Sequence, residues 1–187
     1  MNPFAGRIRS YSHGFGSLVS VIGIAVFASL NFLQAAPADD PASKAVLDAM
    51  AKLNQTPHHE YITTTGDAAA GGTQKNEMIG IGDTNYVKIH DKWTVSPMTP
   101  KMMAEQEKEN IRDAKVYRCQ YERDESVNGE AAAVYKAHSE NENGSSDAEI
   151  WISKSRGLPL RENIDVNGTG RFSVRFDYAN VQAPAVK

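Results

Sequence analysis

Apolar positions recur at two different periods along this chain, and the change of period divides it into helical and extended segments. Between residues 45 and 53 the apolar side chains fall three or four positions apart, as they do on one face of an α-helix. From residue 59 onward apolar and polar side chains mostly alternate, and aromatic and β-branched residues become frequent, which is typical of half-buried strands. The pattern predicts a short helix followed by a strand-rich region.

The first predicted helix lies between Asp40 and Pro57. Asp40 is suited to cap its amino terminus, Pro41 fits its first turn, and Pro57 ends it. The apolar stripe of this helix is narrow, so the helix must pack on a larger element, which we expect to be a sheet.

A second helix is predicted over residues 99–113. Thr99 is suited to its N-cap and Pro100 to its first helical position. Most of the segment is polar, and its thin apolar face begins with Met102 and Met103. Because methionine is flexible and polarisable, this helix is suited to cover a space whose contents vary.

The remaining pattern predicts eight or nine short strands joined by turns and by a loop at 140–147. The expected strands are 61–65, 77–81, 85–89, 93–95, 115–122, 130–139, 148–153, 158–166 and 171–178. No crossover helices separate these strands, so antiparallel pairing is expected. A sheet of this size tends to curl around a cavity or a plug. The predicted fold class is therefore α+β, one curved antiparallel sheet with two helices covering one face.

The first residues of the chain have the pattern of a secretory signal. Arg7 and Arg9 precede an apolar run over 18–30, and small residues around Ala35 and Ala36 follow it. The apolar run is shorter than the ~20 residues of a membrane-spanning helix, and its end suits a signal peptidase. We expect cleavage near Ala35 or Ala36. No cysteine lies near this point, so we expect no lipid anchor.

Removing the signal at 1–36 leaves residues 37–187, which is the size of one domain. Arg7 and Arg9 are the only charged residues of the signal among 20 Lys and Arg and 23 Asp and Glu, so the mature chain has a formal charge of −5. This acidic balance without basic runs argues against nucleic acid and anionic membrane surfaces as partners. The sequence predicts a soluble mature protein in the periplasm, without a membrane span.

No motif predicts catalysis, a metal or a cofactor. The histidines outside the signal are His58, His59, His90 and His138. Adjacent His58 and His59 point to opposite faces of a strand, whereas zinc needs three or four converging ligands. The nucleophile motif Gly-x-Ser-x-Gly is absent, and the Gly/Ala segment 66–72 lacks the ending of a phosphate loop. Catalysis would require a cleft that places His90 or His138 beside a carboxylate.

Cys119 is the only cysteine, so no intramolecular disulfide can form. Its position on an alternating segment predicts a small buried side chain. A reactive or intermolecular thiol would need an exposed, electropositive setting, which Arg118 and Arg123 alone do not establish.

Three segments near the C-terminus are more specific than their composition. They are Glu-Ile-Trp-Ile-Ser-Lys-Ser-Arg-Gly-Leu-Pro-Leu-Arg at 149–161, Val-Asn-Gly-Glu-Ala-Ala-Ala-Val-Tyr at 127–135, and Phe-Asp-Tyr-Ala-Asn-Val at 176–181. Together with the order of the elements, they resemble the LolA-like proteins, which are periplasmic lipoprotein carriers and their relatives. The resemblance covers most of residues 42–184. It implies an unclosed, strongly curved half-barrel whose apolar concave face is covered by helices and receives an acyl chain or another hydrophobic ligand.

Two functions follow as hypotheses. The first is a non-enzymatic periplasmic protein that binds a hydrophobic small molecule, lipid or acyl chain. Its expected cavity wall is Trp93, Met102, Met103, Trp151, Phe172 and Phe176. The second is an envelope protein-interaction or sensor module with the same fold and a filled interior, since aromatic residues alternating on strands are also typical of an ordinary core.

Overall fold

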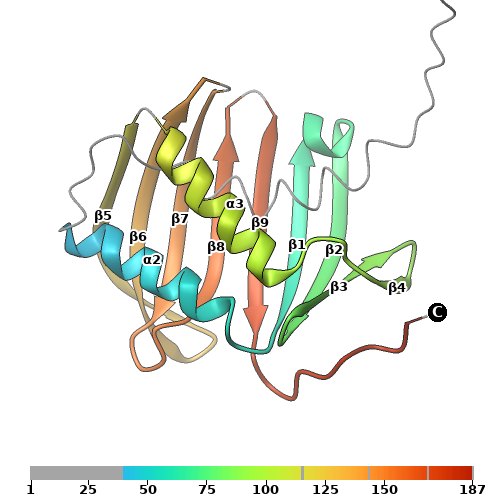
Figure 1. Ribbon diagram of the computed structural model, residues 1–187. Helices are drawn as coiled ribbons and strands as arrows, with labels where there is room; N and C mark the ends of the chain where they lie inside the picture. The colour runs from blue at the N-terminus through green and yellow to red at the C-terminus, as the bar shows by residue number, and fades with distance from the viewer. Residues whose placement is uncertain (1–39, 115, 143, 168, 187) are drawn as a thin grey trace, which may run out of the picture.

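The computed structural model describes residues 40–186 apart from 115, 143 and 168, and apart from the side chains of 107–113. The predicted secretory signal lies outside the described residues. Two helices, α2 (Pro41–Leu53) and α3 (Pro100–Asp113), lie on the same face of one sheet (Figure 1). A short 3₁₀ turn, η1 (Asp67–Ala69), is a further helical element.

The sheet has nine strands, and all neighbouring pairs are antiparallel. They are β1 (His58–Gly66), β2 (Gly72–Ile81), β3 (Thr84–Ile89), β4 (Lys92–Val95), β5 (Val116–Val127), β6 (Glu130–Asn141), β7 (Gly144–Ser153), β8 (Pro159–Val166) and β9 (Gly170–Asp177). Their spatial order is β4-β3-β2-β1-β9-β8-β7-β6-β5, so the curved sheet is not closed and β4 and β5 are its edges. The predicted fold class is confirmed.

This strand order explains the position of α3. The chain runs from the middle of the sheet to one edge through β1–β4, and resumes at the opposite edge with β5. Helix α3 is the connection between these edges, so it must cross the face of the sheet. Figure 1 shows it lying obliquely over the central strands.

The first helix begins and packs as predicted. The Asp40 carboxylate accepts hydrogen bonds from the backbone N–H groups of Ala42 and Ser43, which caps the helix. Its apolar side packs on β5, β7 and β8. The resulting core contains Val46, Ala49, Met50, Leu53, Ile62, Ile150, Ile164, Phe172, Val174 and Phe176. This face of the sheet, which the helices cover, is the concave face.

Three predicted boundaries were wrong. Residues 140–147 do not form a loop, because β6 continues to Asn141 and β7 begins at Gly144. The polar residues there pair across the strands instead, with the buried hydroxyls of Ser139 and Ser146 2.8 Å apart. Likewise, β2 begins five residues before the expected 77 and β5 continues five beyond the expected 122, in stretches where polar residues conceal the alternation.

Candidate functional site

The middle of the concave face, formed by β9, β1 and β2, combines apolar side chains with a few buried polar groups. Glu60 on β1 lies opposite Phe176 on β9 and Met78 on β2. Thr64, further along β1, lies opposite Phe172. All five side chains are at least nine-tenths buried, and Glu60 is 1% exposed. We call these five residues the central strip.

Helix α3 is attached beside this strip by its first turn. Met103 packs on Met78 and Val87. The Asn85 side-chain amide donates to the Met98 carbonyl at 3.0 Å and to the Met103 sulfur at 2.9 Å. Among the described side chains from 101 to 106, only Met103 is buried. These contacts attach the amino-terminal turn of α3 to β2 and β3.

A buried ion pair lies at the start of β1. His58 Nε2 is 3.1 Å from Glu60 Oε1, and its Nδ1 is 2.7 Å from the Thr56 carbonyl oxygen. Burial lowers the pKa of His58, but the hydrogen bond and charge of Glu60 outweigh it, so the pKa is raised overall. Gly80 on β2 makes room for the imidazole, since a Cβ there would lie 2.5 Å from His58 Cε1.

Two buried oxygens of the strip have no hydrogen-bond partner within the described part of the chain. They are Glu60 Oε2 and Thr64 Oγ1. The nearby Tyr178 hydroxyl donates to the Pro159 carbonyl oxygen. Burial, and then the charge of Glu60, raise the pKa of Tyr178, so its hydroxyl stays protonated. Because buried polar atoms are rarely unpaired, these two need an explanation.

The structure places three of the six predicted wall residues on the concave face. Phe172 and Phe176 are in the central strip, and Met103 is beside it. Met102, one position earlier on α3, is 46% exposed.

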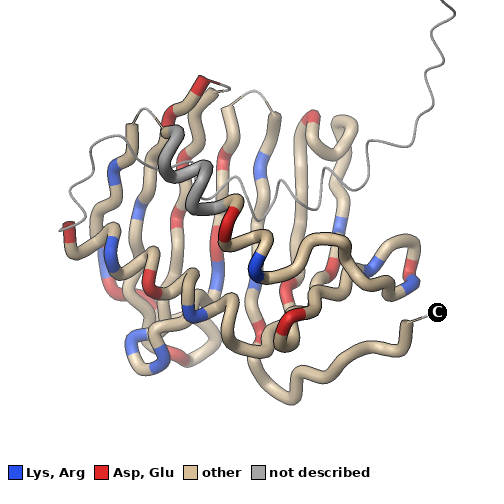
Figure 2. Tube along the Cα trace, viewed as in Figure 1, with Lys and Arg blue, Asp and Glu red and all other residues tan. Residues whose placement is uncertain are grey.

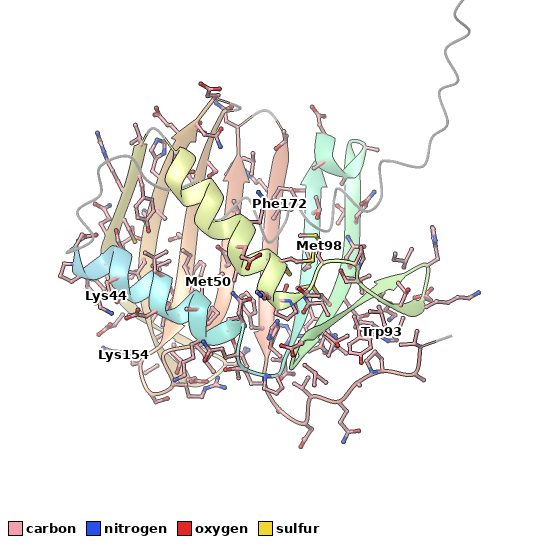
Figure 3. All side chains as sticks on the ribbon, viewed as in Figure 1. Lys44, Met50, Trp93, Met98, Lys154 and Phe172 are labelled. Atoms are coloured by element: carbon pink, nitrogen blue, oxygen red, sulfur yellow. The ribbon has the colours of Figure 1, made fainter. Side chains whose placement is uncertain are left out.

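Trp93 and Trp151 lie on the opposite, outer face, so the six residues do not form one wall. The Trp93 ring meets the His59 ring edge-on at 5.8 Å, and in Figure 3 it lies on the β3–β4 hairpin, well to one side of Phe172. Trp151 packs with Ala132, Val134 and Leu160. Because of this second apolar cluster, β7 is buried on both faces at residues 150–152. The sequence therefore shows no alternation there, and it could not reveal that Trp151 points outward.

A groove of about 850 Å³ crosses the outer face. Its lining includes two parallel rows of polar side chains, each contributed by six neighbouring strands. One row is Arg118, His138, Asp147, Asp165, Arg171 and Thr65. The other is Gln120, Lys136, Glu149, Asn163, Ser173 and Thr63. Arg161 and, between the rows, Cys119, Ala137, Ala148, Ile164 and Phe172 complete the lining. Figure 2 shows that charges of both signs are interspersed along these strands.

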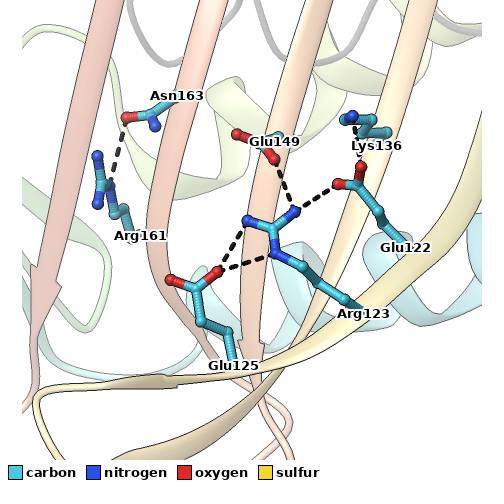
Figure 4. Close-up of polar contacts among 7 residues, drawn as sticks. All are labelled: Glu122, Arg123, Glu125, Lys136, Glu149, Arg161 and Asn163. Atoms are coloured by element: carbon cyan, nitrogen blue, oxygen red, sulfur yellow. Dashed lines mark hydrogen bonds and ion pairs between the residues drawn. The ribbon is translucent and has the colours of Figure 1, made fainter.

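Most charges of this face neutralise one another. Arg123 donates to Glu149 at 3.0 Å, and Lys136 pairs with Glu122 at 2.5 Å (Figure 4). The hydrogen bond from Lys136, which is the largest cause, lowers the pKa of Glu122. The groove therefore combines many hydrogen-bonding groups with little net charge.

His138 lies within hydrogen-bond distance of a carboxylate, but it has no free nitrogen to act as a base. Its Nδ1 lies 2.8 Å from Asp147 and its Nε2 lies 3.1 Å from Glu140. Hydrogen bonds to Asp147 and Glu140 raise the pKa of His138, which favours the imidazolium form and occupies both nitrogens. A base needs a free nitrogen, so we assign no catalysis to it.

Other chemical groups give no further site. Cys119 is half-buried on β5, and burial raises the pKa of its thiol to about 11, which opposes thiolate chemistry. Within residues 40–186, as far as they are described, no three His, Cys, Asp or Glu side chains are grouped to hold a metal. No helix in the same part of the chain is long and apolar enough to cross a membrane.

Sequence reasoning missed Glu60 and His58 as residues of the concave face. The signal was present, because both share the alternation phase of Ile62 and Thr64, which point inward. Charged residues at inward positions are uncommon and deserve notice when the phase is known.

No family model matches the sequence, and no curated protein matches it. Several solved structures are similar to this chain over about three quarters of its length. The lipoprotein LppX of Mycobacterium tuberculosis is 13% identical, with a TM-score of 0.46, over 78% of this chain and 100% of that one. The Pseudomonas aeruginosa MucA/MucB complex matches at 12% identity and a TM-score of 0.49, over 78% of this chain and 59% of that one.

A putative outer membrane lipoprotein-sorting protein domain from Vibrio parahaemolyticus matches at 11% identity and a TM-score of 0.28, over 76% of this chain and 95% of that one. This chain spans about three fifths of the matched chain in the MucA/MucB complex.

Proposed function

We propose that this chain is a non-enzymatic binding protein that holds a hydrophobic ligand, a lipid or acyl chain, on the concave face beneath α3. The supporting observation is that α3 crosses an apolar face, with Met103 of its first turn buried against Met78 and Val87. Ligand sites are typically concave and apolar with a few polar groups, and the central strip has that composition.

The proposed wall keeps Phe172 and Phe176 as its floor and Met103 at the base of α3. Met102 belongs to its exposed rim. Trp93 and Trp151 are excluded because they lie on the outer face.

We further propose that the protein works in the periplasm after export, with cleavage near Ala35 or Ala36. The charge, apolar run and small-residue ending of residues 1–36 support this. The intact mass of protein purified from its own envelope measures the cleavage point directly.

Native mass spectrometry of that same material tests the binding function. We expect a co-purifying apolar molecule. After its removal, the uncharged fluorescent probe N-phenyl-1-naphthylamine should bind to the protein. Met103→Gln should weaken binding several-fold, whereas the matched exposed variant Met102→Gln should leave it nearly unchanged. Protein that is empty and does not bind the probe would refute the function.

A second candidate is an envelope protein-interaction module, and the outer groove favours it. Its polar rows span six strands, which suits contacts to an extended polypeptide rather than to an acyl chain. Affinity capture from envelope extracts, compared with a Lys136→Glu/Arg171→Glu variant, tests this candidate. A specific partner lost in the variant would support it, and identical recovery by both proteins would count against it.

A further inference from the structure

The His58–Glu60 pair is electrically neutral as a unit. The Thr56 carbonyl can only accept a hydrogen bond, so His58 Nδ1 carries a proton. The 3.1 Å contact between His58 Nε2 and Glu60 Oε1 joins two acceptor atoms unless one further proton lies between them, so the contact requires that proton. Whichever atom holds it, the two side chains together carry no net charge.

The second carboxyl oxygen, Glu60 Oε2, is an acceptor in both arrangements. It is buried and has no partner in the part of the chain that the structure describes. The Tyr178 hydroxyl, which could otherwise serve as a donor, already donates its proton to the Pro159 carbonyl oxygen. A group that completes this site must therefore bring its own hydrogen-bond donor.

The surroundings of Glu60 restrict what carries that donor. Its register partners are Phe176 and Met78, and Met78 contacts Met103 of α3. An apolar chain passing beneath α3 would thus end beside the carboxyl group. The body of the ligand is apolar and its donor is at one end.

The charge of the head group follows from the neutrality of the pair. An ammonium group would add an unbalanced positive charge to a buried site, which is costly. A carboxylate has no proton to donate and would face the acceptor oxygen of Glu60. A hydroxyl or amide supplies a donor without charge.

We infer that Glu60 Oε2 receives an uncharged hydrogen-bond donor, a hydroxyl or amide, at the head of an apolar ligand bound on the concave face. This inference rests on the proposed function and deepens it. It distinguishes alcohols, monoacylglycerol-like molecules and fatty amides from ionised fatty acids and amines.

Four probes of equal chain length test it: 1-decanol, decanamide, decylamine and decanoate. Competition against N-phenyl-1-naphthylamine at neutral pH gives their relative affinities for the mature protein. Because a hydrogen bond to a carboxyl group is worth about a factor of ten or more, decanol and decanamide should bind at least about tenfold more tightly than the charged probes. Equal affinities, or tightest binding of decanoate or decylamine, would overturn the inference.

Two variants assign the preference to Glu60. Glu60→Gln places an amide donor in the site, so the advantage of decanol over decanoate should shrink by about tenfold. Thr64→Val removes the other unpartnered atom, four residues and roughly 13 Å along β1, beyond reach of a head group at Glu60. It should keep the preference of the unmodified protein.

The design separates the two claims. If no probe binds, including N-phenyl-1-naphthylamine, the proposed function fails. If all probes bind without regard to head group, the function stands and the role of Glu60 fails. The four-probe series needs only the unmodified chain, so a variant that does not fold leaves the test intact.

Discussion

On the concave face the described charged side chains are few and almost fully buried, whereas on the outer face they are numerous and exposed. His58, Glu60 and Glu162 belong to the first group, with Glu60 and Glu162 1% and 2% exposed. Outside, charges pair along the strands, as Arg171 does with Asp165 at 2.7 Å. Exposed pairs contribute about 0–1 kcal/mol each, while a buried charge is tolerated only with its partner.

This difference indicates that polar groups on the concave face carry a desolvation cost that those on the outer face largely avoid. The outer face resembles an ordinary solvated sheet, in which neighbouring charges satisfy one another at little cost. The concave face keeps a buried ionisable pair where aliphatic side chains would pack without penalty. We therefore interpret the inner polar groups as functional.

The largest expected effect is a difference in the free energy of unfolding between variants at two adjacent residues of β9. Phe172 points inward and is 1% exposed, and Arg171 points outward. Phe172→Ala should lower the free energy of unfolding by about 3–5 kcal/mol, because it leaves a cavity. Arg171→Ala should change it by about 0.5 kcal/mol or less. Urea unfolding followed by circular dichroism measures both, and similar losses would show that the faces are not distinct.

A somewhat smaller effect is expected from breaking the buried pair. His58→Leu leaves Glu60 buried without its partner and should cost about 3 kcal/mol. The double variant His58→Leu/Glu60→Leu should recover most of this loss, since an apolar pair replaces the ionic one. A double variant no more stable than the single one would mean that the pair stabilises the fold. The pair would then be explained by its contribution to stability, and nothing in it would indicate a role in ligand recognition.

The sequence predicted the elements because their local signals agree. Asp40 and Thr99 cap α2 and α3 as expected, and the alternation around Phe172 correctly placed its side chain inward. The antiparallel class followed from the absence of crossover helices. These features depend on neighbours in sequence, which a single chain reveals.

The site was harder to predict because it depends on strand phase and on pairing between distant strands. Trp151 lies between Ile150 and Ile152, and all three are buried. The sequence therefore shows no alternation that would indicate which face of the sheet Trp151 is on. Glu60 became interesting only when its partners Phe176 and Met78 were known. Neither fact is encoded within a short window of sequence.

The smallest effect concerns pH, and its sign is fixed by the raised pKa of His58. A histidine whose folded pKa exceeds its ordinary value of 6.5 contributes stability that is complete below that value. The contribution is lost as pH rises through the folded pKa. Stability should therefore fall as pH rises above about 6.5. Carboxylates with lowered pKa, such as Glu130 beside Arg156, act with the opposite sign but only below their ordinary value of 4.5.

His138 has the same sign, because Asp147 and Glu140 raise its pKa, so it must be separated from His58. Urea unfolding at several pH values above 6.5 measures how steeply the free energy of unfolding falls with pH. This pH slope should be modestly reduced in His138→Gln, whose imidazole is half-exposed. The slope should be reduced further in His58→Leu/Glu60→Leu, whose imidazole is buried. If the double variant keeps the slope of the unmodified chain while His138→Gln loses it, the outer face controls the titration. The buried pair would then hold its proton unchanged across the range, and the contrast between the faces would have to rest on packing alone.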